Sequence, residues 1–173
     1  ASLGHASFFA VGAYTSSLLA LNLGVTPLLG LLIGACASCL LGVVIGFPSL
    51  RLKGDYLALA TFGFGVIVYS VAKNWVGLTR GPMGLPGIPQ PTLFFIHFDS
   101  LISYLLLVTF FVLVTIFVIR RIVNSPFGRV LQGIREDEIA CKSLGKNTDR
   151  YKIWVFVIGA GFAGIAGSLY AHY

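Results

Sequence analysis

Five long apolar runs constrain this sequence more than any other feature, because none of them contains a Lys, Arg, Asp or Glu side chain. A membrane-spanning helix needs about 20 apolar residues, with a range of roughly 17 to 25. The alternating pattern of a membrane β-barrel is absent, so we predict helices, which satisfy their own backbone hydrogen bonds in lipid. The predicted spans cover residues 3–21, 27–47, 56–72, 101–119 and 153–171.

The composition excludes most other classes of protein. Hydrophobic residues make up 57% of the 173 residues and charged residues 10%, whereas a soluble domain has roughly 45–50% apolar and about 25% charged residues. A soluble enzyme, a disordered tail and a disulfide scaffold are therefore excluded. We expect an all-α integral membrane protein with about five transmembrane helices, which form part of a polytopic bundle.

The two ends of the chain predict that it is an internal part of a longer membrane protein. It begins at Ala1 without the charged segment and cleavage site of a signal peptide, and it stops at the edge of an apolar run. Two alternatives to a complete span stay open for residues 3–21, namely the second half of a span and a re-entrant segment. The third run contains Gly63 and Gly65, which is typical of a helix beside a polar cavity.

The basic residues predict the orientation in the membrane. Segment 120–152 contains eight Lys or Arg residues and segment 48–55 contains two, whereas segment 73–100, on the opposite side, contains two. The positive-inside rule therefore places 48–55 and 120–152 in the cytoplasm and makes 73–100 an outer loop. The net charge of +6 indicates this topology and contact with anionic headgroups, and no nucleic-acid partner is predicted.

Small residues recur at every fourth position in two of the spans. Such stripes let helix backbones approach closely in lipid, so they predict a tight multi-helix core. Cys36 and Cys39 lie in the same region, and we interpret them as packing residues, because no second pair or nearby His completes a metal or redox site. The stripes are Gly30, Gly34, Ser38, Gly42 and Gly46 in the second span, and Gly159, Ala163, Gly167 beside Ala160, Gly164, Ser168 in the fifth.

The predicted outer loop is rich in Gly and Pro. Four Pro and four Gly lie between residues 77 and 91, which disfavours a helix and predicts turns and extended chain. Asp99 is predicted to cap the fourth span. Two interpretations stay open for this loop: contact with a partner that delivers a substrate, and a simple connector.

The predicted cytoplasmic loop contains signals for two short helices. Ser125 and Pro126 are typical of an N-cap and a first helical position. The three acids at 136–138 suit the start of a second helix, and the last of them pairs with Lys142 four residues on. Gly145 suits the position after that helix. The loop is interpreted either as a helix that docks on a cytosolic partner or as a solvated charge cluster.

Four motifs follow one another along nearly the whole chain in the order of a known family. They are residues 2–9 (SLGHASFF, followed by GAYT at 12–15), 50–58 (LRLKGDYLA), 79–89 (TRGPMGLPGIP) and 134–145 (IREDEIACKSLG). Together they resemble the LivM-type permeases of branched-chain amino acid ABC importers. The resemblance implies that residues 1–173 belong to a single transmembrane permease domain for leucine, isoleucine or valine in the bacterial cytoplasmic (inner) membrane.

The family resemblance also implies a set of partners. These are a second related permease, two cytosolic ATP-binding subunits and a periplasmic or extracellular amino-acid-binding protein. The chain itself is then not an enzyme and holds no cofactor, because ATP binds to a partner subunit. The loop would contact that subunit through Arg135, Glu136, Asp137, Glu138, Ala140 and Gly145.

Polar residues in or beside the spans are candidates for the substrate pathway. For each, a purely structural role stays open as an alternative to a role in the pathway. This role is an interhelical hydrogen bond or, for the aspartate, a helix cap. The candidates are Ser2, His5, Asp55, Tyr56 and Thr61.

The chain departs from the family pattern at two positions. Cys141 stands in the coupling signature, and Val66 follows Gly-Phe-Gly where many relatives carry Glu.

Three other functions are alternatives to an importer of branched-chain amino acids. A secondary carrier normally places an ionisable group in mid-membrane, and His5 is the only such candidate in the predicted spans. An intramembrane enzyme needs a nucleophile–base pair or a metal set, and the sequence contains neither motif. A urea or short-chain amide ABC permease is the nearest rival, and the Gly/Pro loop favours amino acids.

Overall fold

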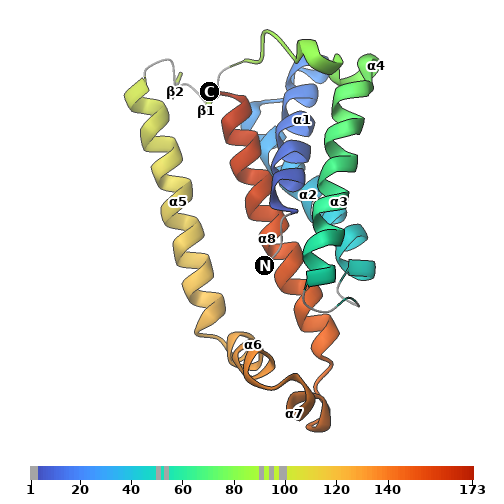
Figure 1. Ribbon diagram of the computed structural model, residues 1–173. Coiled ribbons are helices and arrows are strands. Elements are labelled where there is room, and N and C mark those ends of the chain that lie inside the picture. Colours follow the sequence, from blue (N-terminus) through green and yellow to red (C-terminus); the bar gives the residue numbers. More distant parts are fainter. Residues whose placement is uncertain (1–3, 50–51, 53–54, 90–91, 94–95, 98–100) are drawn as a thin grey trace.

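The computed structural model describes residues 4–49, 52, 55–89, 92–93, 96–97 and 101–173, and this part of the chain is mostly helical (Figure 1). Five of its helices are long and apolar enough to cross a membrane, and they coincide with the predicted spans. The prediction of an all-α membrane protein is therefore confirmed. The five are α1 (His5–Leu23), α2 (Pro27–Ser49), α3 (Asp55–Asn74), α5 (Leu101–Val123) and α8 (Thr148–Ala171).

Helices α1, α2 and α8 form the packed centre of the molecule. The whole small-residue stripe of α2 is buried, as its spacing predicts. A methyl group added at Gly12 of α1 would overlap the Gly164 carbonyl of α8, and one added at Gly42 would lie 2.8 Å from the Ala160 Cβ. The missing side chains thus let three backbones meet at distances that larger residues would prevent.

Serine hydroxyl groups join these three helices. Ser38 of α2 donates a 2.8 Å hydrogen bond to the Phe8 carbonyl of α1. Ser168 of α8 donates to the Gly12 carbonyl of α1 at 3.0 Å. Cys39 packs in the same interface, with its Sγ atom 3.6 Å from the Val157 carbonyl. These buried side chains therefore form hydrogen bonds between helices. Such bonds fix the relative positions of the helices, which apolar contact alone would not do.

Helix α1 begins at half the depth of the bundle. A Cβ atom at Gly159, midway along α8, would lie 3.5 Å from His5 Nε2 in the first turn of α1. The two helices then run in the same direction, because Ser16 hydrogen-bonds His172 at the far end of α8 with a 2.7 Å Oγ–Nε2 distance. Figure 1 shows the start of α1 beside the middle of α8.

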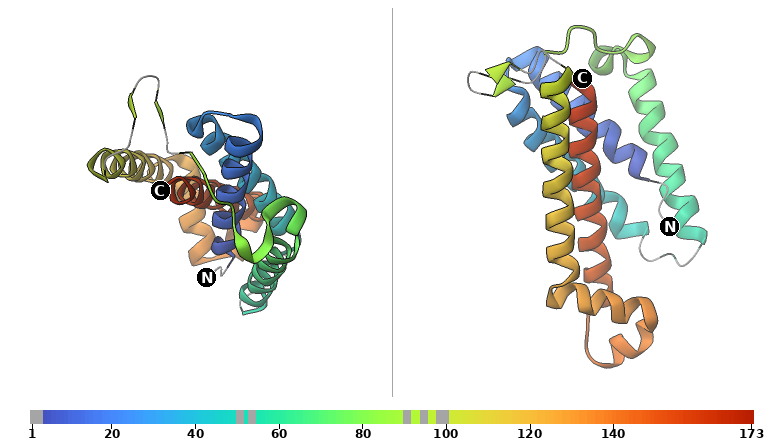
Figure 2. Two further views of the ribbon diagram at one scale, coloured as in Figure 1. Left: turned by 90° about the horizontal axis from the view of Figure 1, so that it is seen from above. Right: turned by 90° about the vertical axis from the view of Figure 1, so that its left-hand side faces the viewer.

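Helices α3 and α5 lie outside this packed centre. Helix α3 contacts α1 and α2, and most of its side chains stay exposed. Helix α5 stands beside α8 (Figure 2) and is held at one end by the Tyr104 hydroxyl, which donates to the Leu169 carbonyl. An apolar groove of about 450 Å³ otherwise separates the two helices, with Val108, Phe111 and Phe162 among its lining residues.

The predicted outer loop contains more regular structure than its composition suggests. The expectation of turns and extended chain is wrong at its start, where α4 (Val76–Thr79) and the 3-10 helix η1 (Gly81–Met83) follow α3. The Thr79 hydroxyl donates to the Ala72 carbonyl at the end of α3 at 2.5 Å, which ties the single turn of α4 to α3. Strands β1 (Thr92–Leu93) and β2 (Ile96–His97) form an antiparallel pair further on. Asp99 lies outside the described residues.

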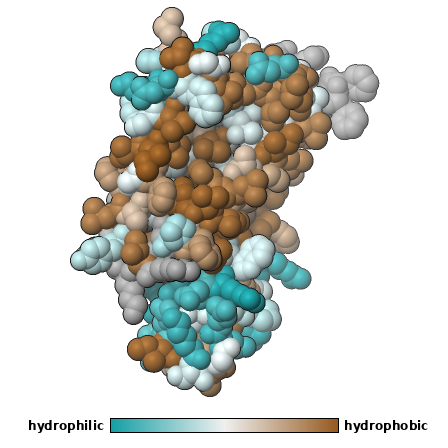
Figure 3. All heavy atoms as spheres, turned by 90° about the vertical axis from the view of Figure 1, so that its right-hand side faces the viewer, coloured by the Kyte–Doolittle hydropathy of each residue, from teal (hydrophilic) through white to brown (hydrophobic). Residues whose placement is uncertain are grey.

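The other end of the molecule carries α6 (Pro126–Glu136) and α7 (Glu138–Ser143). The Ser125 hydroxyl caps α6 by accepting from the Gly128 N–H at 3.3 Å, so the predicted start of this helix is confirmed. On the face that Figure 3 draws, hydrophobic residues cover the middle of the molecule and hydrophilic residues gather at both ends. This distribution suits a multi-pass membrane protein whose short helices lie beside the bilayer.

Candidate functional site

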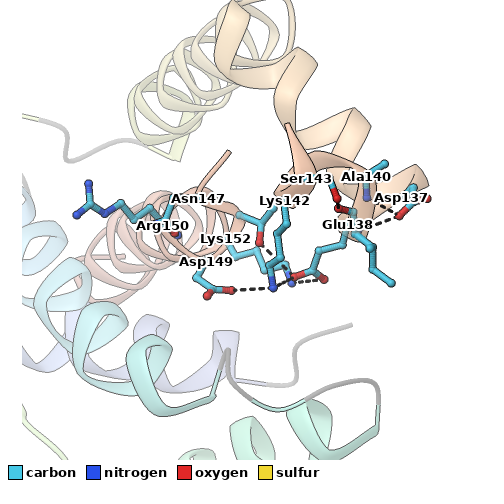
Figure 4. A network of polar contacts seen from close by, with 11 residues as sticks. Asp137, Glu138, Ala140, Lys142, Ser143, Asn147, Asp149, Arg150 and Lys152 are labelled. Carbon is cyan, nitrogen blue, oxygen red and sulfur yellow. Dashed lines mark hydrogen bonds and ion pairs between the residues drawn. The ribbon is translucent and has the colours of Figure 1, made fainter. Parts of the chain in front are cut away.

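A network of charged side chains joins α7 to the first turns of α8 (Figure 4). Its centre is Glu138, whose carboxylate oxygens lie 2.6 Å from Lys152 Nζ and 3.0 Å from Lys142 Nζ. The Thr148 hydroxyl donates a third contact to this carboxylate at 3.2 Å. The hydrogen bonds from Lys152 and then Lys142 lower the pKa of Glu138 to about 2, so the carboxylate is charged at neutral pH.

Backbone capping fixes both ends of α7. Asp137 accepts hydrogen bonds from the Ile139 and Ala140 N–H groups at 2.8 and 3.0 Å. At the other end Gly145 adopts a positive φ of 75°, and its N–H donates to the Lys142 carbonyl at 3.0 Å. This left-handed glycine after the last helical turn is the C′ arrangement that the sequence predicted. A six-residue helix, too short to be stable alone, is thus held by its caps and by Glu138.

The exposed surface of α7 is partly apolar. Ile139 and Leu144 are 78% and 79% exposed, and Ala140 is exposed between them. Arg135 and Glu136, at the end of α6, are exposed as well. We call these five residues the α7 surface. Large exposed apolar side chains beside charged ones, outside the membrane belt, are typical of a protein-binding surface.

The structure divides the predicted coupling residues into two groups. Arg135, Glu136 and Ala140 face outward, as a docking surface requires. Glu138 instead turns toward α8, and 29% of its side chain stays exposed. The carboxylate of Asp137 caps the N-terminus of α7. Ile139 and Leu144, which are not among the predicted coupling residues, complete the outward surface. The sequence signal that could have identified them is their apolar character between the charged residues of segment 135–146.

The structure describes the side chains of three of the predicted pathway residues, His5, Tyr56 and Thr61. His5 lies against Phe8, with a ring-centroid distance of 6.3 Å. Tyr56 is exposed, while Thr61 is buried and donates to the Ala58 carbonyl of its own helix at 3.0 Å. Ser2 and the side chain of Asp55 lie outside what the structure describes, although α3 begins at Asp55 as expected. A role for these residues in the pathway stays a prediction.

A cavity of about 650 Å³ lies instead between α1 and α3, near the end of the molecule that we predict to be outside. We call it the α1–α3 cavity, and its size falls within the range of about 300 to 1,000 Å³ that is typical of ligand sites. No predicted pathway residue is among its described lining residues. Its described lining residues are Ala6, Ser7, Ala10, Tyr14, Phe62, Gly65, Val66, Val68, Tyr69, Ala72, Lys73, Gly81, Pro82 and Gly84.

The outer loop covers the α1–α3 cavity. Gly81 packs against the end of α3 so closely that a Cβ atom there would lie 2.7 Å from the Lys73 carbonyl. Further along, the Pro89 carbonyl lies 2.8 Å from His172 Nδ1. A carbonyl oxygen only accepts, so Nδ1 donates to it, and in the neutral imidazole Nε2 then accepts from Ser16. The loop is therefore attached to α3 at one side and to α8 at the other.

Comparison with known families decides what kind of protein carries these features. The family model described as the branched-chain amino acid transport system / permease component matches residues 1–173. The chain belongs to this family. No solved structure matches it closely enough to add to this assignment.

Curated relatives of this permease family agree with the family match. The LivM permease proteins of the high-affinity branched-chain amino acid transport systems of Salmonella typhimurium and Escherichia coli are each 40% identical over 98% of this chain. A tyrosine transport system permease protein of Clostridioides difficile is 27% identical over 94% of it. The chain spans 45% of the length of the two LivM proteins, and thus about half of the curated relatives that it matches.

Membership of a permease family relates the α1–α3 cavity and the α7 surface to transport across a membrane. A permease needs a passage across the bilayer, and the α1–α3 cavity opens beside the outer loop while α7 lies at the opposite end. No group of three or more His, Cys, Asp or Glu residues in the described part of this permease chain is placed to hold a metal ion.

Proposed function

We propose that this permease chain forms part of the translocation pathway of an ABC importer for leucine, isoleucine or valine. In this proposal it pairs with a second related permease in the bacterial inner membrane. Two cytosolic ATP-binding subunits drive the cycle, and a binding protein delivers the amino acid from outside. The observation that carries the proposal is the 40% identity over 98% of the chain to permeases of high-affinity branched-chain amino acid transport systems.

We propose further that the α7 surface docks on an ATP-binding subunit. Ile139 and Leu144 would insert into an apolar groove of that subunit, as amphipathic helices do in many complexes. Three features of the chain support this: α7 is capped at both ends, it is bonded to α8 through Glu138, and it exposes two large apolar side chains. Because α7 is held in this way, a movement of the ATP-binding subunit would move α8 as well and would not be lost in a local rearrangement of α7.

The path of that force through the chain follows from the contacts. A pull on α7 reaches the start of α8 through the Glu138 carboxylate and Lys152. Helix α8 in turn packs on α1 through the glycine contact at Gly12 and Gly164. Nucleotide-driven motion of α7 would therefore move α8 and α1 together and change the shape of the α1–α3 cavity.

The substrate is tested with the complete importer in liposomes. ATPase activity is measured with a binding protein that is empty or offered leucine, tyrosine or urea. We expect stimulation by the leucine-loaded protein. Selective stimulation with urea or tyrosine would keep the importer and replace the substrate. If no ATP-binding subunit co-purifies with the permease and uptake follows an ion gradient instead, the chain belongs to a secondary carrier.

The docking surface is tested with a double substitution, Ile139→Asp with Leu144→Asp. We expect the ATP-binding subunit to dissociate and the leucine-stimulated ATPase activity to fall at least tenfold, because the two apolar residues that the proposed interface would bury become charged. The matched control is Met83→Asp, which charges an apolar residue that is 89% exposed at the other end of the molecule and should leave the ATP-binding subunit bound. Wild-type ATPase activity in the double variant would contradict the assignment of this surface.

A further inference from the structure

One buried hydroxyl group in the α1–α3 cavity lacks a partner. Ser7 is only 3% exposed, and among the described residues its Oγ atom is the one buried side-chain oxygen or nitrogen without a hydrogen bond. The other buried serines of α1 are satisfied: Ser16 bonds to His172 and Ser17 donates to the Ala13 carbonyl. Since burying a polar group without a partner costs free energy, an unpaired one calls for an explanation.

The position of Ser7 supplies that explanation. It belongs to the first turn of α1, which begins beside the midpoint of α8, so its hydroxyl lies halfway along a membrane-spanning helix. Gly65 of α3 lies next to it, because a Cβ atom there would be in van der Waals contact with Ser7 Oγ at 3.5 Å, and both residues line the cavity. Transporters commonly hold substrate at this depth, beside helices that begin or break within the membrane.

The walls of the cavity select a class of ligand. Phe62, Val66 and Ala10 provide an apolar lining, and Lys73 is the one charged residue among the described lining residues. Lys73 lies eight residues beyond Gly65 on α3, which is about 12 Å along a helix, at the mouth under the loop. A positive charge at the mouth, with no carboxylate among the described lining residues, favours a ligand with a carboxylate and disfavours a cationic one.

From these observations we infer that the α1–α3 cavity is a binding site for a neutral amino acid with an aliphatic side chain. The carboxylate is drawn in at Lys73, the charged end of the bound molecule hydrogen-bonds the Ser7 hydroxyl, and the side chain packs on Phe62 and Val66. This inference rests on the proposed function, because it assigns a location to the transported substrate. It replaces the sequence-based candidates with residues that line one open cavity.

The test uses Ser7→Cys in the complete permease, assembled with its partner subunits in liposomes and freed of other reactive cysteines. A small charged thiol reagent is added from the outside, with and without saturating L-leucine or L-lysine. We expect labelling of the cysteine, a slowing of at least tenfold by leucine, and no slowing by lysine. Labelling that is absent, or that leucine does not slow, would overturn the site.

The experiment distinguishes failure of the proposed binding site from failure of the proposed importer function. Wild-type leucine uptake without protection of the cysteine removes the site and leaves the importer. Protection by leucine in a permease that shows no ATP-driven uptake keeps the site and removes the importer. Protection by lysine equal to that by leucine would overturn the selectivity argued from Lys73.

A second pair of variants separates binding from folding. Ser7→Ala removes the unpaired hydroxyl, so we expect thermal stability that is unchanged or higher, with the KM for leucine uptake raised about tenfold and kcat little changed. The matched control is Ser17→Ala, another buried serine of α1 whose hydroxyl bonds within its own helix, and it should keep the wild-type KM. If Ser7→Ala lowers stability and leaves KM unchanged, the hydroxyl has a structural role and the inference is wrong.

Discussion

The packed centre of α1, α2 and α8 and the peripheral helix α5 are both apolar, yet they behave in opposite ways. The centre meets through glycine and serine, so that Gly12 contacts the Gly164 backbone directly. Helix α5 carries large side chains on every face and buries almost none of them. It reaches α8 chiefly through the Tyr104 hydroxyl and joins the rest of the chain through α6.

The comparison teaches that hydrophobicity does not decide which helices pack together in a membrane. Lipid is as apolar as leucine, so a large apolar side chain gains little by leaving lipid for protein. Small residues gain more, because they allow backbone contacts and short hydroxyl bonds such as the 2.8 Å bond from Ser38 to Phe8. The apolar surface of α5 is therefore compatible with lipid or with further protein.

The strongest test of this comparison is Gly12→Ala. The added methyl group would overlap the Gly164 carbonyl, and neither backbone can move without separating α1 from α8. We expect a loss of about 3 kcal/mol in the free energy of unfolding, measured by denaturant titration of the purified permease. Gly63→Ala in α3 is the control, because no atom lies within 4 Å of its added Cβ. Equal losses in both variants would refute the close-contact argument.

A smaller effect is expected for Ser38→Ala. The variant removes the hydroxyl that bonds the Phe8 carbonyl across the α1–α2 interface, and such bonds in membranes are worth about 0.6 kcal/mol on average, with a maximum near 1.7. The control is Thr109→Ala on α5, whose hydroxyl bonds only to the Leu105 carbonyl of its own helix. Thermal denaturation in one detergent compares the two, and a larger loss for the α5 variant would reverse the ranking of the regions.

The effect with the lowest upper limit is expected at the ion pairs of Glu138, which connect α7 to α8. Glu138→Gln removes the charge that faces Lys152 and Lys142, at a cost of about 1 kcal/mol or less, because the site is partly hydrated. The pKa of Glu138 is lowered from 4.5 to about 2, so its carboxylate stabilises the fold above pH 4.5. That contribution is lost as the pH falls from 4.5 through 2.

The measurement for Glu138 is the difference in unfolding free energy between wild type and Glu138→Gln as a function of pH. We expect a constant difference above pH 4.5 that narrows as the pH falls toward 2. Glu136→Gln serves as the control, because Glu136 is exposed and no ion pair is formed by it among the described residues. A difference that widens on acidification would show that the carboxylate does not stabilise this connection.

Local signals predicted much of the fold. The capping by Ser125 and the left-handed glycine at 145 were predictable because each depends on residues within one or two helical turns. The stripe from Gly30 to Gly46 also predicted which face of α2 is buried. The short helix α4 was missed, because its one turn depends on the Thr79 hydroxyl and on the end of α3.

The candidate sites were less predictable than the fold. Glu138 was assigned to the docking surface through the resemblance of its loop to the family motif, and only the return of the chain to Lys152 shows that it faces α8. Ser7 was not among the predicted pathway residues. Its lack of a partner depends on Gly65, which lies 58 positions away.

The sequence by itself determined that this protein spans the membrane with helices, because uncharged runs of 17 to 21 residues have no other stable form in lipid. It determined the family as well, through motifs that keep their order. Only the tertiary structure decided that α1 begins at half depth, that α5 stands apart, and that Ser7 faces a cavity. Those features depend on contacts between distant segments, and residue spacing within a single helix indicates which face packs but not which segment packs against it.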